Sequence, residues 1–158
     1  MRLKTKKQQF CTIKTEKNGI YLSKILLRST FMDKTVFESG RIYINGFELN
    51  KTDNIEWQKH PKFDGVFTKS LISARDNNNN LSAMLVKIEP NCEIGNHIHE
   101  GKAELHEVIY GDGVTLVNDK SIVYKPGIIS LIPADVPHSV KANNSGLILL
   151  AKFTPPLN

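Results

Sequence analysis

Cysteine and long apolar runs are both scarce in this chain of 158 residues. The two cysteines, Cys11 and Cys92, lie far apart and form no C-x-x-C pair, whereas a small secreted fold normally carries more, so a reducing compartment fits better. The longest apolar run near the C-terminus spans residues 147–151, far short of the about 20 residues that cross a bilayer. No apolar segment follows the basic start "MRLKTKKQQF". We therefore expect a soluble, cytoplasmic protein without a membrane partner.

Positive charge is concentrated at the N-terminus. Residues 1–35 carry a formal charge of +7, whereas the remaining 123 residues carry −2. A basic arm could contact nucleic acid, but no aromatic–basic RNA signature is evident, and an arm of this length leaves little room for a helix-turn-helix. Runs of charge are usually solvated, so we do not expect a nucleic-acid partner.

Helix signals are few, and strand signals recur along most of the chain. One weak amphipathic stretch spans residues 22–37, and alternating residues on both sides of Asn18-Gly19 predict a hairpin. Many short strands at such spacing indicate a sandwich or barrel. We expect Asn77–Asn80 as a hairpin loop and residues 53–63 as an irregular connection whose Trp57 covers one end of the core. The predicted strands are residues 41–49, 65–74, 81–89, 93–99, 103–110, 114–117, 121–124, 128–132, 138–142 and 147–153.

The stretch "IGNHIHEGKAE" at residues 94–104 concentrates ionisable groups in apolar surroundings. His97 and His99 share a face in a strand because side chains alternate. Glu104 opens the next predicted strand, and His138 opens a later one. Three imidazoles and one carboxylate suit Zn, Fe, Mn, Ni or Cu, and a closed structural zinc site is not expected because no thiolate joins them. Each of these residues alone is more often a solvated polar group, so the prediction depends on the set.

The spacing resembles the first sequence motif of the cupin superfamily, G-x5-H-x-H-x3-4-E-x6-G. The chain has His97, one residue, His99, four residues, Glu104, six residues and Gly111. Asn91 stands in place of the leading glycine, and asparagine tolerates a left-handed turn conformation.

A second stretch is similar to the second cupin motif, G-x5-P-x-G-x2-H-x3-N. Gly127, five residues, Pro133, one residue, Asp135, two residues and His138 follow the pattern, with Asp135 in place of the second glycine. The closing asparagine comes one place late, at Asn143, which leaves its role open. The resemblance covers about residues 65–153.

This resemblance implies an all-β double-stranded β-helix, or jelly-roll barrel, over residues 41–158, after a basic arm of residues 1–40. Family members hold one divalent metal ion with three histidines and one glutamate, which here would be His97, His99, Glu104 and His138. Its identity among Fe, Mn, Ni, Zn and Cu stays open. Members often dimerise through N-terminal strands, so a homodimer is expected.

Two function classes remain compatible with such a site. One is a metal-dependent enzyme on a small oxygenated or anionic molecule, of the dioxygenase, isomerase or lyase type. The other is a non-catalytic cupin that binds or senses a small ligand. Four protein ligands leave two positions on a six-coordinate ion, and the site would carry about +1, which favours an anionic partner.

His106 and Tyr110 lie on the face of Glu104 if the strand over residues 103–110 is regular. His106 is then a candidate general base or a hydrogen-bond partner of a metal ligand. A local bulge would instead turn His106 outward into solvent. Tyr110 is a weaker catalytic candidate and fits equally well as core filling.

Overall fold

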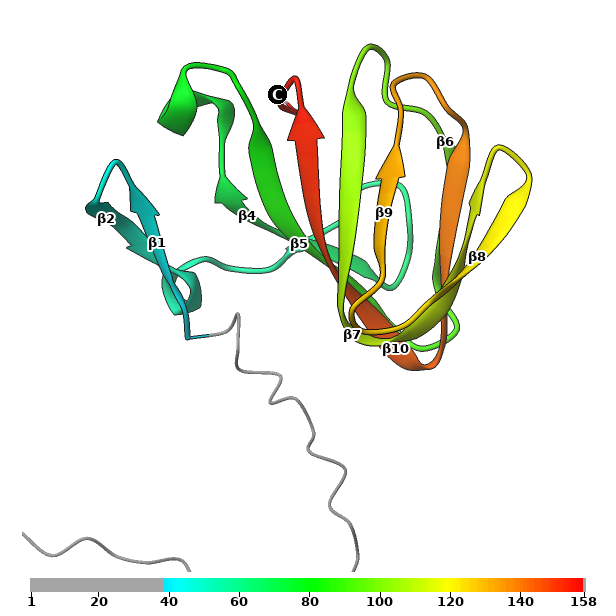
Figure 1. Ribbon diagram of the computed structural model, residues 1–158. Helices are drawn as coiled ribbons and strands as arrows, with labels where there is room; N and C mark the ends of the chain where they lie inside the picture. Colours follow the sequence, from blue (N-terminus) through cyan, green and yellow to red (C-terminus); the bar gives the residue numbers. More distant parts are fainter. Residues whose placement is uncertain (1–38, 158) are drawn as a thin grey trace, which may run out of the picture.

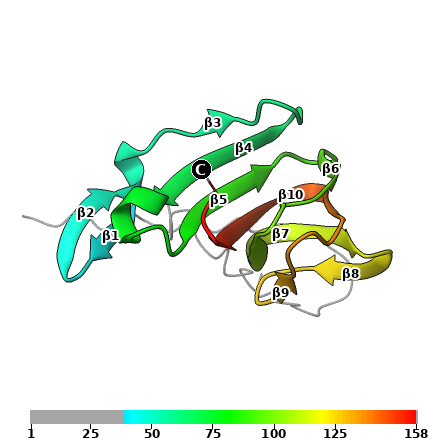
Figure 2. The same cartoon turned by 90° about the horizontal axis from the view of Figure 1, so that it is seen from above.

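The structure, a computed structural model, describes residues 39–157, most of which form one curved antiparallel sheet (Figure 1). The main sheet has the order β3-β4-β5-β10-β7-β8, with β6 paired to β10 and β9 paired to β7 (Figure 2). The expected all-β jelly-roll class is therefore confirmed. The strands are β3 (Gln58–Lys59), β4 (Val66–Ile72), β5 (Ser82–Ile88), β6 (Glu93–His97), β7 (Ala103–Val117), β8 (Lys120–Tyr124), β9 (Ile129–Ile132) and β10 (His138–Thr154).

Strands β7 and β10 are each one long element where the sequence predicts two. Residues 111–113 and 143–146 are turn formers, but here they bend paired strands without ending them, and the β7–β10 register shifts between Ala142 and Leu147. Gly111 adopts a φ of +79°, and a Cβ there would collide with the carbonyl oxygen of Gly146. The close approach of the two backbones at this bend therefore requires glycine.

Apolar side chains on the concave side of the sheet form the core. In β7 the burial alternates, so Glu104, His106 and Val108 point inward. Val108 joins a buried cluster with residues from β4, β5, β8 and β10. The cluster consists of Val66, Val86, Ile88, Val108, Tyr124, Val140, Ala142, Leu147, Leu149, Ala151 and Phe153.

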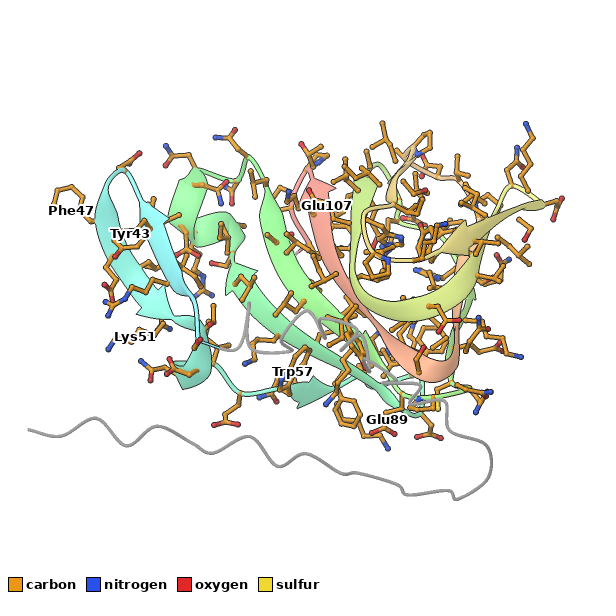
Figure 3. The ribbon with its side chains drawn as sticks, turned by 60° about the horizontal axis from the view of Figure 1, so that its bottom comes forward. Tyr43, Phe47, Lys51, Trp57, Glu89 and Glu107 are labelled. Carbon is orange, nitrogen blue, oxygen red and sulfur yellow. The ribbon has the colours of Figure 1, made fainter. Side chains whose placement is uncertain are left out.

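Residues 41–51 form a separate two-stranded hairpin instead of the predicted single strand. Strand β1 (Arg41–Ile44) pairs with β2 (Phe47–Lys51) across Asn45-Gly46, both of which have positive φ. Asn-Gly is a strong hairpin signal that the prediction over residues 41–49 missed. The hairpin stands to one side of the main sheet and exposes the side chain of Phe47 to 79% (Figures 1 and 3).

A short connection crosses the outer face of the main sheet. It contains the 3-10 turn η2 (Thr52–Asn54), and the buried Lys69 donates from Nζ to the carbonyl oxygen of Thr52 at 3.0 Å. The Nζ atoms of Lys69 and Lys87 lie 5.2 and 5.0 Å from the ring centre of Trp57. Trp57 (labelled in Figure 3) thus contacts lysines of β4 and β5, and it does not join the buried core cluster.

The loop between β4 and β5 carries the asparagine run, as expected. The 3-10 turn η3 (Ala74–Asn77) is capped by Ser73 and Asp76, which exchange side-chain and backbone hydrogen bonds. The expected hairpin around Asn18-Gly19 and the amphipathic stretch over residues 22–37 lie outside the described residues. Within residues 39–157, no helix has the length and apolar character needed to cross a membrane.

We predict that Gly111→Ala lowers the free energy of unfolding by about 2–4 kcal/mol, because a positive φ and a backbone collision both oppose the methyl group. Gly127→Ala is the matched control, since Gly127 has a φ of +91° and no atom within 4 Å of the added Cβ. This control should cost only the conformational strain of about 1–2 kcal/mol. Urea unfolding measures both, and equal losses would contradict the collision.

Candidate metal centre

Three imidazoles and one carboxylate meet on the concave side of the barrel. One nitrogen or oxygen from each of His97, His99, Glu104 and His138 lies within 4.8 Å of the others. The β6–β10 pairing places His97 opposite His138, so their ring centres are 4.1 Å apart. The structure therefore brings together all four residues that the two motifs single out, and this group could hold a metal ion.

Glu104 lies at the centre of the group and is 5% exposed. Its Oε2 atom lies 2.9 Å from Nε2 of His138 and 3.2 Å from Nε2 of His99. Burial raises the pKa of this carboxyl, but hydrogen bonds from His106, His138 and His99 outweigh burial and hold the pKa far below its usual range. Glu104 is therefore a carboxylate at neutral pH.

Two backbone carbonyls fix the tautomers of the facing histidines. Nδ1 of His97 lies 2.9 Å from the oxygen of Gly95, and Nδ1 of His138 lies 3.0 Å from the oxygen of Val136. A carbonyl oxygen only accepts, so in both rings the proton is on Nδ1, and Nε2 of a neutral ring presents a lone pair. This is the arrangement that metal-binding histidines usually have.

The donor atoms fit a cation. A neutral His138 would place its Nε2 lone pair 2.9 Å from a carboxylate oxygen, and these two acceptors repel each other. A positive charge between them relieves that repulsion, either as a proton on His138 or as a metal ion held by several donors. The site is therefore built for a cation, with proton and metal as competitors.

The pKa values of the two facing histidines shift in opposite directions. Burial lowers the pKa of His97 and so favours its neutral, metal-binding form. Burial also opposes the charged form of His138, but the hydrogen bonds to Glu104 and to the oxygen of Val136, together with the charge of Glu104, outweigh it and raise the pKa. A proton therefore competes with a metal ion more effectively on His138 than on His97.

His106 points inward and contacts Glu104 directly. It is 3% exposed, its Nε2 lies 2.8 Å from Glu104 Oε1, and its Nδ1 lies 2.9 Å from the hydroxyl of Tyr124. Burial raises the pKa of Tyr124, so this hydroxyl stays protonated near neutral pH. Both nitrogens of His106 are engaged inside the protein. This geometry favours the role of a hydrogen-bond partner over that of a general base, which needs a lone pair that reaches the substrate.

Tyr110 lies away from the imidazoles. The β7–β10 register shifts between Ile148 and Leu149, where Tyr110 and Val108 are the partners, so a bulge at Ile109 breaks the alternation. Tyr110 instead lines a cavity of about 290 Å³ with Trp57 and Lys87, and none of the four clustered residues lines that cavity.

Several contacts at the site were not predicted from the sequence. Tyr124 was one of many apolar or aromatic strand residues, and its alternation with Ile122 indicates an inward side chain but not its partner. The ring of Phe153 meets His99 edge-on at 5.0 Å between ring centres and closes one side of the site. The hydrogen bonds to the backbone oxygens of Gly95 and Val136 could not be predicted, because a backbone acceptor does not depend on residue type.

Part of the chain is similar in sequence to known proteins. The sequence model of the family described as "Cupin domain" matches residues 84–151. An oxalate-binding protein of Thermotoga maritima is 32% identical over 67 residues, which make up 42% of this chain and 55% of that protein. The match thus spans about half of the relative's length.

Solved structures show the same fold. The structure of KdgF from Halomonas sp. superposes with a TM-score of 0.61 at 20% identity, covering 76% of this chain and 97% of that one. The structure of a predicted oxalate decarboxylase from Thermotoga maritima superposes with a TM-score of 0.56 at 26% identity, covering 63% of this chain and 90% of that one. An RmlC-like cupin from Shewanella frigidimarina gives 0.57 at 21% identity, with 65% and 86% covered. Residues 84–151 thus match the cupin domain family, and the described residues have the fold of solved cupin structures.

We predict up to one divalent ion per chain in the purified protein, and its removal by a chelator should lower the Tm. Binding to the folded state alone adds about 2.7 kcal/mol at a hundredfold excess over Kd, which corresponds to roughly 10 °C. His97→Ala and His138→Ala should abolish both the metal content and the chelator effect. His60→Ala, which alters an imidazole outside the cluster, should keep both. Elemental analysis with thermal melts checks this, and unchanged metal in the first two variants would contradict the site.

We also predict that the Tm difference between metal-loaded and metal-free protein grows as the pH rises above the usual histidine pKa of about 6.5. In metal-free protein the raised pKa of His138 contributes stability that is complete below its unfolded value and is lost as pH rises through the folded value. Metal requires the neutral ring, so its binding strengthens over the same range. Melts of both forms across this range measure the difference, and a constant or falling difference would refute the competition.

Proposed function

We propose that this chain holds one divalent transition metal ion, drawn from Fe, Mn, Ni, Zn or Cu, and uses it to bind a small oxygen-rich anion. The observation that carries this proposal is the convergence of one ligand atom each from His97, His99, Glu104 and His138 within 4.8 Å, with His97 and His138 protonated on Nδ1. When bound, the ion supplies a Lewis acid that attracts anionic oxygen atoms.

The charge of the site supports an anionic ligand. Three neutral imidazoles and one carboxylate around a divalent ion leave about +1, counted from their protonation states. Within the described residues, no second acidic side chain is buried beside Glu104. Phe153 adds an apolar wall against His99, which limits water around a bound anion and strengthens its attraction to the site.

A small dicarboxylate is the ligand class that the comparisons favour. The Thermotoga maritima relative is described as an oxalate-binding protein, and the segment of this chain that matches the family, residues 84–151, contains all four clustered residues. Oxalate offers two adjacent carboxylates that can both contact one ion. We therefore propose binding of oxalate or a similar compact acid, in a cytoplasmic homodimer.

Turnover of that anion is a second candidate function, of the lyase, isomerase or dioxygenase type. It is favoured by the 26% identity to a structure described as a predicted oxalate decarboxylase. The contacts of His106 weigh against a simple base mechanism, because both of its nitrogens already have partners. Binding without turnover therefore has the stronger geometric support.

We predict that oxalate binds to the metal-loaded protein and not to the metal-free protein. Calorimetric titration of both forms tests this, with acetate as a control that has only one carboxylate. His99→Ala, which removes one ring of the cluster, should weaken oxalate binding at least tenfold, or about 1.4 kcal/mol. Equal oxalate affinity with and without metal would contradict the proposal. Formation of carbon dioxide and formate by the loaded protein would establish the second candidate instead.

A further inference from the structure

The two oxygens of Glu104 have different partners, and this asymmetry carries a further inference. Oε2 faces His99 and His138, whereas Oε1 lies 2.8 Å from Nε2 of His106. One side of the carboxylate is therefore turned to the cluster, and the other is held by a residue outside it.

The proton positions along this contact follow from the chemistry of the partners. A carboxylate only accepts, so His106 carries its proton on Nε2 and donates to Oε1. Nδ1 of the neutral ring then accepts the hydroxyl proton of Tyr124 at 2.9 Å. His106 is thus in the opposite tautomer to His97 and His138, whose protons are on Nδ1.

The tyrosine that hydrogen-bonds Nδ1 of His106 is fully buried. Tyr124 ends β8 with 0% exposure, and the hydroxyl of Ser130 hydrogen-bonds it from β9. Ser130 is also the residue of β9 that pairs with His106 in β7. Three strands therefore meet around one hydroxyl, and no buried side-chain nitrogen or oxygen lacks a partner among residues 39–157.

We infer that Tyr124 and His106 act as positioning residues that hold Glu104 as a one-oxygen ligand, with Oε2 toward the imidazoles and Oε1 withheld. This inference rests on the proposed metal site. Tyr124 and His106 would not contact the ion themselves. They would determine that Glu104 binds it through one oxygen and not through two. A carboxylate without this restraint can bind an ion through both oxygens and so occupy a position that an incoming anion needs.

The first test needs no metal. Two-bond proton–nitrogen NMR spectra of the imidazoles of metal-free protein should show His106 protonated on Nε2, with His97 protonated on Nδ1. In Tyr124→Phe, which removes only the hydroxyl, the Nδ1 resonance of His106 should shift because it loses its donor, while the ring stays protonated on Nε2. Tyr43→Phe removes an exposed hydroxyl and should leave that resonance unchanged. A His106 ring with its proton on Nδ1 alone in the wild type would overturn the inference.

The second test uses Mn²⁺ affinity. Loss of an outer hydrogen-bond partner of a metal ligand typically weakens binding 10- to 100-fold. His106→Leu cannot donate to Glu104 and should fall in that range, whereas the amide of His106→Gln can donate and should recover most of the affinity. Tyr124→Phe should weaken Mn²⁺ binding severalfold, and Tyr43→Phe should leave the Mn²⁺ affinity unchanged. Equal losses for the Leu and Gln variants would overturn the positioning role, because a purely structural effect does not depend on a donor.

The two tests separate failure of this inference from failure of the proposed function. If wild-type protein binds neither Mn²⁺ nor any other ion, the proposed function fails, and with it the claim that Glu104 is a metal ligand. If wild-type protein binds metal but the tautomer or the donor dependence is not as stated, only the inference about Tyr124 and His106 fails.

Discussion

A buried negative charge on Glu104 is the constraint around which the inner face of this barrel is arranged. An isolated carboxylate in a low-dielectric interior is strongly unfavourable, and it persists only where donors or cations compensate it. Here each oxygen meets at least one imidazole nitrogen, and the imidazoles come from β7, β10 and the segment that follows β6. The fold must bring these segments together, because Glu104 is almost fully buried and solvent cannot stabilise its charge.

Strand β10 provides most of that assembly. It pairs with β5, β6 and β7, so one continuous segment links the core, the histidine pair and the carboxylate strand. The bend at residues 143–146 lets it follow the curvature of the barrel without losing its partners. As a result, His138 at one end and Phe153 near the other both face the same site.

Much of the site was predictable from residue order alone, and the exceptions have specific causes. The two-residue period of a strand places His97 beside His99, but only the motif resemblance connects them to His138, which lies 39 residues further along. The same period failed for Tyr110, because the bulge at Ile109 is set by pairing with β10. The Asn45-Gly46 turn was readable locally and was missed. The contact of Tyr124 with His106 depends on barrel closure, which no local pattern encodes.

The position of Trp57 has a consequence for how the folding of this protein can be observed. It is the single tryptophan of the chain, and it lies on the outer face against Lys69 and Lys87, across the sheet from the histidines. Indole fluorescence therefore reports whether the crossing connection stays attached to the sheet, and it is blind to rearrangements within the inner face. If the fluorescence and the imidazole resonances change at the same denaturant concentration, the two faces unfold as one cooperative unit.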